Sequence, residues 1–224
     1  MKKLGLLSIG ETPRPDILSV MSRELPDTEL VEYGILDALD ERQRQSLKPL
    51  PGDFPLVSRK RDGSQFSLGK KQAVELMEQG LRRLHEQGIA VVVLLCTCRF
   101  SLNIPEGMLV IEAGRVIDAA LEALARDGMT TGLLTPLPSQ ADELAAHYAY
   151  LPGRLVTASA SPYEDVRFAE VAAERLRGAD FVFLHCMGYT EPYRAAVHRV
   201  CGCPVIRASS LVARFAAELM NVQE

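Results

Sequence analysis

The sequence lacks an apolar run long enough to cross a membrane. Its longest such run, Ile89 to Cys96, is about eight residues, whereas a membrane-spanning helix needs roughly 20. The first residues begin like a signal peptide, but the apolar segment ends at Ser8, and Glu11 and Arg14 follow. No hydrophobic region with a cleavage site can form there. We therefore expect a cytoplasmic protein with no membrane partner.

The sequence also lacks a concentration of positive charge. The formal net charge is −4, and 24% charged residues against 47% hydrophobic residues is an ordinary balance for a globular protein. Proteins that bind nucleic acid need a dense basic surface, so we expect no nucleic-acid partner. The densest basic segments, Arg59–Arg61 and Lys70–Lys71, lie among loop-forming residues, and we interpret them as solvated loops.

Cysteines are few and odd in number. In a reducing compartment the five cysteines are expected to be free thiols rather than a disulfide framework. The two C-x-C pairs, Cys96–Cys98 and Cys201–Cys203, together offer four thiolates to a zinc ion. Structural zinc pairs are usually spaced more widely, and the two pairs are predicted at opposite sheet edges. The sequence therefore predicts no metal site.

An internal repeat is the strongest organisational feature of the sequence. The apolar run Gly5–Ser8 matches Gly132–Thr135, and each is followed by a proline-containing loop. The run Val91–Cys96 matches Phe181–Cys186. In each half, therefore, a cysteine ends the second of these two apolar strands. Each half is thus predicted to run strand, loop, helix, cysteine-ended strand, loop, strand and helix.

Amphipathic helices are predicted before the two cysteine-ended strands, over residues 71–87 and 166–177. Short apolar strands that alternate with helices indicate parallel sheets covered on both faces. We predict an α/β protein with two pseudosymmetric, doubly wound parallel-sheet halves and a ligand cleft between them. The halves are expected to comprise residues 1–106 plus 210–224 and residues 107–209.

Residues 40–69 break the repeat. Smaller candidate strands lie at 29–33 and 154–157, but the stretch from 40 to 69 has no counterpart in the second half and is rich in proline and glycine. A structureless loop of this length is unusual in a compact domain. We therefore interpret it as an excursion with local structure or a function, such as a hairpin or a lid.

Cys96 and Cys186 are the candidate catalytic residues. In a parallel α/β sheet, ligands bind beyond the carboxyl ends of the strands, and both cysteines stand at that position. If a pseudo-twofold axis relates the halves, the two thiols face one another across the cleft. A nearby helix N-terminus would lower a thiol pKa from about 8.5 toward neutrality. The alternative is that these cysteines only fill space at strand ends, as buried cysteines often do.

Other residues at the same edge are candidates for contacting a ligand. Hydroxyls and backbone amides near helix N-termini suit a carboxylate or phosphate, and arginines suit an anion. His185 precedes Cys186 and is expected to point to the opposite face, into the core. The candidate substrate-binding residues are Ser8, Thr12, Arg14, Thr97, Cys98, Arg99, Thr135, Pro136, Ser139, Met187, Gly188 and Tyr189.

Several short motifs resemble those of the AroM family. They are Ile9-Gly10, Tyr33–Asp37, Val91–Thr97, Cys186–Tyr189 and Leu211–Arg214, and together they run over nearly the whole chain. The resemblance to AroM proteins itself names no reaction. What it implies about chemistry comes from a wider superfamily with a similar architecture.

That wider group is the aspartate/glutamate racemase superfamily. It includes cofactor-independent amino-acid and hydantoin racemases, maleate isomerases and arylmalonate decarboxylases, in which a cysteine ends a central strand in each of two pseudosymmetric domains. Cys96-Thr97-Cys98 resembles the first cysteine motif and Cys186-Met187-Gly188 the second. Cys98 departs from the usual small hydroxyl residue, and no glutamate follows Cys186 directly, unlike in the amino-acid racemases.

The resemblance implies a cofactor-independent racemase or isomerase, or a decarboxylase, that uses cysteine thiols on a small carboxylic acid. No cofactor and no metal are expected, the partner is a small-molecule carboxylate, and a homo-oligomer is compatible with the sequence. The alternative is a non-catalytic protein that binds or senses a small carboxylate on the same fold, because fold alone does not fix function.

Overall fold

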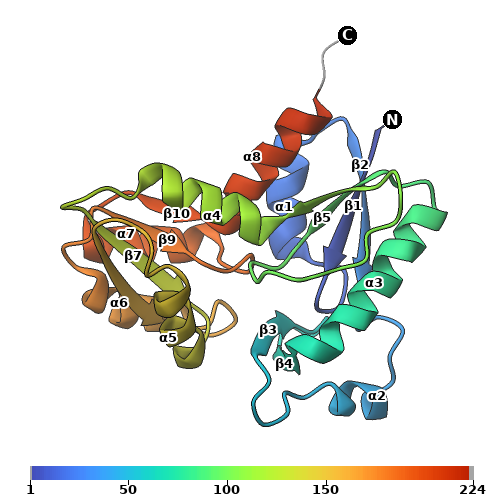
Figure 1. Cartoon of the computed structure of the whole chain (residues 1–224), viewed down its shortest axis with the longest axis horizontal. Helices are drawn as coiled ribbons and strands as arrows, with labels where there is room; N and C mark the ends of the chain where they lie inside the picture. Colours follow the sequence, from blue (N-terminus) through green and yellow to red (C-terminus); the bar gives the residue numbers. More distant parts are fainter. Residues whose placement is uncertain (1, 222–224) are drawn as a thin grey trace. The chain divides into compact units, whose positions relative to one another are not determined.

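The computed structural model describes residues 2–221 and divides into two compact units. Of the described residues, unit 1 comprises 2–115 and 213–221, and unit 2 comprises 116–212. Each unit is built on a four-stranded parallel sheet (Figure 1). The chain passes from one unit to the other within two helices, α4 (Ala113–Leu124) and α8 (Ala208–Met220).

The sheet of unit 1 has the strand order β2-β1-β5-β6, with all strands parallel. Its strands are β1 (Lys2–Ser8), β2 (Thr28–Gly34), β5 (Val91–Leu94) and β6 (Leu109–Glu112). Helix α1 (Pro15–Glu24) joins β1 to β2, and helix α3 (Lys70–Glu86) leads into β5. These elements follow the predicted apolar runs and the helix predicted over 71–87.

The sheet of unit 2 repeats this order as β8-β7-β9-β10, again with all strands parallel. Its strands are β7 (Thr130–Thr135), β8 (Arg154–Ser159), β9 (Phe181–Leu184) and β10 (Val205–Arg207). Its helices are α5 (Pro138–His147), α6 (Val166–Ala173), which continues as a 3₁₀ turn, and α7 (Glu191–Cys201). The identical strand order confirms the predicted α/β class with two equivalent parallel-sheet halves.

Residues 40–69 form an element of unit 1 that unit 2 lacks, confirming the predicted local structure. It contains a short helix, α2 (Glu41–Ser46), and an antiparallel hairpin of β3 (Pro55–Arg59) and β4 (Gln65–Gly69). The buried carboxylate of Glu11, in the loop after β1, ties this excursion to the sheet. The carboxylate forms an ion pair with Arg44 at 2.7 Å and accepts a hydrogen bond from the Arg61 backbone N–H at 2.8 Å.

Both faces of the first sheet are buried, as short apolar strands of a parallel sheet require. Leu7 and Val92 pack against α3, and Leu6 and Val93, at alternate strand positions, are also fully buried. Gly80 lets α3 approach the sheet closely, because a Cβ there would lie 2.6 Å from a Leu7 methyl group.

No helix within residues 2–221 is long and apolar enough to span a membrane.

Two details differ from the sequence-based expectation. Strand β6 pairs with β5 in the first sheet, whereas the expected division at residue 107 assigned residues 109–112 to the second half. In addition, residues 97–108 contain no helix, while helix α7 fills the equivalent stretch of unit 2. The loop after Cys96 therefore does not lead into a helix N-terminus.

Candidate functional site

Cys96 and Cys186 occupy equivalent places in their own units. Each follows a central strand by two residues and lies in the hydrophobic cluster that contains Leu94 or Leu184, so both point to the same face of their sheets. Both residues are largely buried and both are free thiols. The strand repeat in the sequence thus correctly placed each cysteine at the carboxyl end of a central strand.

The surroundings of Cys96 favour its thiolate. Its pKa is lowered, first by a hydrogen bond from the Cys98 thiol, then by the Cys98 backbone N–H and by the positive charges of Lys70 and Arg14, against the opposing effect of burial. The sequence predicted a lowered pKa caused by a helix N-terminus. The structure gives the same direction with a different cause, because no helix follows Cys96 directly.

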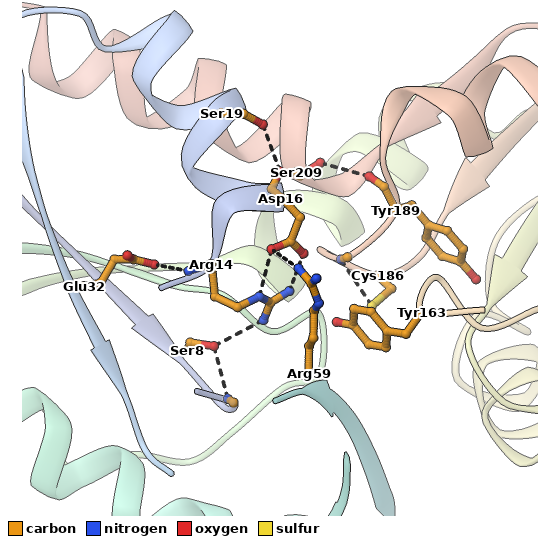
Figure 2. Close-up of polar contacts among 12 residues, drawn as sticks. Ser8, Arg14, Asp16, Ser19, Glu32, Arg59, Tyr163, Cys186, Tyr189 and Ser209 are labelled. Carbon is orange, nitrogen blue, oxygen red and sulfur yellow. Dashed lines mark hydrogen bonds and ion pairs between the residues drawn. The ribbon is translucent and has the colours of Figure 1, made fainter. Parts of the chain in front are cut away.

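Arg14 is buried and anchors the end of β1 (Figure 2). Its guanidinium forms a bidentate pair with Asp16, at 3.0 and 2.7 Å, and donates to the Ser8 hydroxyl at 3.3 Å. Its backbone N–H donates to Glu32 at 2.8 Å. Burial raises the pKa of Glu32, although the Arg14 N–H and guanidinium oppose this shift. Ser8 and Arg14, both predicted site residues, are thus in direct contact.

The remaining candidates of unit 1 lie around this edge with differing exposure. Thr12 is held by Asp37, which accepts from its hydroxyl at 2.6 Å and from its N–H at 2.9 Å. Thr97 and Cys98 are half-buried, and Arg99 is exposed. The hydroxyl of Thr12 is therefore engaged in fixing the loop after β1, whereas Cys98 acts directly on Cys96.

Lys70 was missed by sequence reasoning, and its interpretation as part of a solvated loop was wrong. It is the first residue of α3 and is half-buried. Its ammonium group lies 5.9 Å from the ring centre of Phe54 and 5.6 Å from that of Phe100. The sequence contained no signal for this arrangement, because the three residues lie 16 and 30 positions apart along the chain.

Cys186 lies in a cluster of aromatic and backbone groups in unit 2. The Gly188 N–H points at the Cys186 sulfur at 3.5 Å (Figure 2). A Cβ at Gly188 would lie 2.6 Å from the Tyr163 hydroxyl oxygen, so the glycine lets this ring approach the backbone closely. The hydroxyl of Tyr189 donates to the Ala160 carbonyl at 2.7 Å. Burial, followed by the charge of a nearby Cys186 thiolate, raises the pKa of Tyr189 well above 10.

The other candidates of unit 2 differ in exposure. Thr135, Pro136 and Met187 are buried and Ser139 is exposed. The Thr135 hydroxyl donates to the Leu137 carbonyl at 3.0 Å, so it stabilises the turn after β7. Tyr163 was not among the predicted residues. It follows β8, the neighbour of β7, so the loop after the candidate strand at 154–157 was the signal that could have indicated it.

His185 is buried on the face opposite Cys186, as predicted. Its Nε2 lies 3.0 Å from the Tyr148 hydroxyl, which donates to Asp118 at 2.6 Å. Burial lowers the pKa of His185 to about 4, although the Asp118 charge opposes this shift. The imidazole is therefore neutral near pH 7 and, since the Tyr148 proton goes to Asp118, donates its own N–H to the tyrosine oxygen.

Within residues 2–221, no group of three or more histidine, cysteine or acidic side chains is arranged to hold a metal ion. A pocket of about 520 Å³ lies on the excursion, lined by Gln45, Lys48, Pro49, Lys60, Gln65, Phe66 and Ser67. None of the predicted site residues lines this pocket. It is therefore separate from the thiol sites.

A sequence model of the family described as AroM protein matches residues 4–220, so the chain belongs to the AroM family. Among curated proteins, none matches the chain at a significant level.

Solved structures share its fold at low sequence identity. Arylmalonate decarboxylase matches with a TM-score of 0.59 at 21% identity, covering 99% of this chain and 93% of that chain. Glutamate racemase from Francisella tularensis matches with a TM-score of 0.59 at 11% identity, covering 98% and 80%. Allantoin racemase from Klebsiella pneumoniae matches with a TM-score of 0.54 at 15% identity, covering 98% and 88%. The chain therefore has the fold of the Asp/Glu racemase-like proteins.

Proposed function

We propose that this AroM family protein is a cofactor-independent enzyme that moves a proton at the carbon next to the carboxylate of a small carboxylic acid. The observation that carries the proposal is the pair of buried thiols, Cys96 and Cys186, at equivalent strand ends of two sheets with the same strand order. The proposal keeps the sequence expectation that no cofactor is needed, because the thiols themselves supply acid and base. It also keeps the expectation of a cytoplasmic protein.

The reactions named by the matched structures share one step that a thiol can perform. Decarboxylation of an arylmalonate leaves a carbanion that must gain a proton, and racemisation of glutamate or allantoin removes a proton and returns one. A thiolate takes the proton as the C–H bond breaks and the S–H bond forms. In a carboxylic acid the electron pair passes into the carboxylate as an enediolate, whereas in allantoin, which has no carboxylate, it passes into the ring carbonyl. A thiol then returns a proton to the carbon.

The two thiol environments suit these roles in different ways. Cys96, with its lowered pKa and the nearby charges of Lys70 and Arg14, suits the base. Cys186, beside the Gly188 N–H and the buried Tyr189, offers a thiol next to a backbone donor that can hold developing negative charge. Stabilising the enediolate is the harder part of the reaction, since a carbon acid of this kind loses its proton reluctantly.

Hydrogen exchange at carbon tests the proposal directly. Phenylmalonate and both enantiomers of glutamate are incubated with the protein in deuterated water, and deuterium incorporation and decarboxylation are followed by NMR. The wild-type protein is expected to turn over at least one of them. The Cys96→Ala, Cys186→Ala double variant should lose the activity, and Cys201→Ala, a thiol whose pKa burial raises to about 11, should keep it.

Binding without turnover is the competing outcome. If the acids raise the thermal unfolding temperature of the wild type and of the double variant equally, and no exchange occurs in either, the protein is a carboxylate-binding module and the enzymatic proposal fails.

A further inference from the structure

We propose that Lys70, held between Phe54 and Phe100, is the carboxylate anchor beside Cys96, and that this site selects carboxylic acids with an aromatic or other planar apolar substituent and no amino group. The inference rests on the proposed function, because it names the substrate class of the same thiol site. It assigns a role to a residue that neither the repeat nor the cysteine motifs indicated.

The position of the Lys70 ammonium is fixed from two sides. Its distances of 5.9 Å and 5.6 Å to the ring centres of Phe54 and Phe100 are within the range of cation–π attraction. Its backbone N–H donates to the Phe54 carbonyl at 3.0 Å, which ties the start of α3 to the segment that carries one of the rings. A long flexible side chain is thereby held in a narrow range of positions, which lowers the entropic cost of binding an anion.

The charge of Lys70 is not neutralised by a neighbouring carboxylate. Within residues 2–221 it forms no ion pair, in contrast to Arg14, which is paired with Asp16. Asp53 also lies at the start of α3, but its carboxylate accepts the backbone N–H groups of Phe54, at 2.9 Å, and Lys71, at 3.4 Å. A ligand carboxylate is therefore a suitable counter-ion for the Lys70 ammonium.

Phe100 places this ammonium near the reacting thiol. It follows Cys96 by four residues and packs in the same hydrophobic cluster, to which Phe54 also contributes. Independently, the charge of Lys70 contributes to the lowered pKa of the Cys96 thiol. A carboxylate held by Lys70 thus brings its neighbouring carbon toward the sulfur.

The two rings and the fixed ammonium together determine which acids fit. Aromatic rings favour a planar apolar substituent, which can form an offset-stacked or edge-to-face pair with them. An amino acid would bring its own ammonium close to that of Lys70, and the two like charges would repel one another. Amino acids such as glutamate are therefore expected to bind less well than aryl acids.

This arrangement also gives the excursion a role. Phe54 and Lys70 directly flank the β3–β4 hairpin, so residues 55–69 determine where both stand. The second half of the chain has no such hairpin. We infer that the excursion completes the Cys96 site.

Alkylation of Cys96 tests the anchor without requiring turnover. Iodoacetate carries a carboxylate next to its reactive carbon and iodoacetamide is its neutral counterpart. In both cases the thiolate forms a C–S bond as iodide leaves. The rate of alkylation of Cys96 by iodoacetate, divided by its rate with iodoacetamide, is measured by peptide mass spectrometry. This ratio should fall about tenfold in Lys70→Met, equivalent to about 1.4 kcal/mol. It should stay near the wild-type value in Lys70→Arg and in Lys71→Met, the exposed neighbour.

A change in the thiolate population affects both reagents, so the ratio isolates the anchoring of the carboxylate. An unchanged ratio in Lys70→Met would overturn the proposal. Should that variant fold poorly by circular dichroism, Lys70→Gln, which keeps a polar side chain of similar reach, is measured in its place.

Protection against iodoacetamide tests the substrate class. Phenylacetate should protect Cys96 at concentrations at least tenfold below those of acetate or L-glutamate, and Phe54→Leu should reduce this advantage. Equal protection by glutamate and phenylacetate would contradict the selection for aryl acids. If phenylacetate still protects Cys96 but no acid exchanges hydrogen at carbon, the proposed role of Lys70 is supported and the proposed enzymatic function is contradicted.

Discussion

The Cys98 thiol exerts the largest influence on the pKa of Cys96. Cys98 stands where related motifs place a hydroxyl residue, and both groups can donate a hydrogen bond to a thiolate. We expect Cys98→Ala to raise the pKa of Cys96 and to slow its alkylation by iodoacetamide at pH 7 about threefold to tenfold. Cys98→Ser should stay closer to the wild type, because a hydroxyl remains as donor.

The measurement is the pH dependence of the alkylation rate at Cys96, with Cys201 as internal reference. A lowered pKa leaves more thiolate at neutral pH, so the rate profile of Cys96 should rise at lower pH than that of Cys201, whose pKa is about 11. Identical profiles for Cys98→Ala and the wild type would show that the thiol hydrogen bond has no effect.

His185 gives a second prediction at the scale of one residue, on stability. Its pKa is about 4 in the folded protein and close to 6.5 when unfolded, so between these values the unfolded chain binds more protons. Stability is therefore full above about pH 6.5 and is lost as the pH falls toward 4. The loss at pH 5 is about 2 kcal/mol.

Urea unfolding at pH 7 and pH 5 measures this loss. In His185→Gln, where an amide N–H replaces the ring donor to Tyr148, the difference in unfolding free energy between the two pH values should shrink by that amount. His85→Gln, a substitution at an exposed histidine, is the control and should leave the difference unchanged. A wild-type difference retained in His185→Gln would rule out the buried imidazole as its source.

Among the elements, the excursion is tied to the loop after β1 by the buried carboxylate of Glu11. Glu11 accepts from Arg44 and from the Arg61 N–H, and the Glu11 N–H donates to the Arg59 carbonyl at 3.1 Å. Replacing Glu11 by alanine leaves these donors without a charged partner, at a cost of about 2 kcal/mol. Hydrogen exchange should then increase over residues 55–69.

The control is Glu41→Ala, which removes a carboxylate from the exposed surface of the same excursion, where it accepts a hydrogen bond from the Gln45 side chain at 2.6 Å. Its effect should remain below about 0.5 kcal/mol. Glu11→Gln should fall between the two, because the amide oxygen can still accept from the Arg61 N–H. If hydrogen exchange over residues 55–69 is the same in Glu11→Ala as in the wild type, this role of the carboxylate is contradicted.

The elements were predictable from the sequence to the extent that local patterns define them. The apolar runs that became β1, β5, β7 and β9 are continuous and bounded by turn residues, so periodicity located them. The division at residue 107 is different, because nothing in the run 109–112 says which sheet it joins. Only its backbone hydrogen bonds with β5 decide that.

The candidate site was predictable only where it coincides with a strand end. Cys96, Cys186 and Ser8 follow from the rule that ligand sites lie at carboxyl ends of parallel strands. Lys70 follows from no such rule, because a hairpin brings it to Phe54 and Phe100 by tertiary packing alone. The cause of the lowered pKa of Cys96 escaped for the same reason, since residues 97–108 form no helix despite the repeat.

At the scale of the whole molecule, the structural repeat has two thiols in matching places but not in matching surroundings. Cys96 lies near two cations, whereas Cys186 lies beside tyrosines and the Gly188 N–H. A copied packing residue would need neither a Cys98 donor nor a glycine-limited approach of Tyr163. The divergence between the two copies therefore argues for different tasks, with Cys96 suited to the thiolate state.

Single substitutions separate these tasks. We expect Cys96→Ala and Cys186→Ala each to reduce deuterium exchange at the substrate carbon by at least about 100-fold, the usual contribution of a positioned acid or base. If the substrate is chiral, each variant should also lose interconversion of the enantiomers, because returning a proton to the opposite face needs a second group. Chiral chromatography and NMR on the same samples measure both quantities, with Cys203→Ala, a buried thiol outside the predicted site, as control. Full racemisation by Cys96→Ala would reduce the chemistry to Cys186 alone, and Cys96 would then be a packing residue whose lowered pKa has no part in turnover.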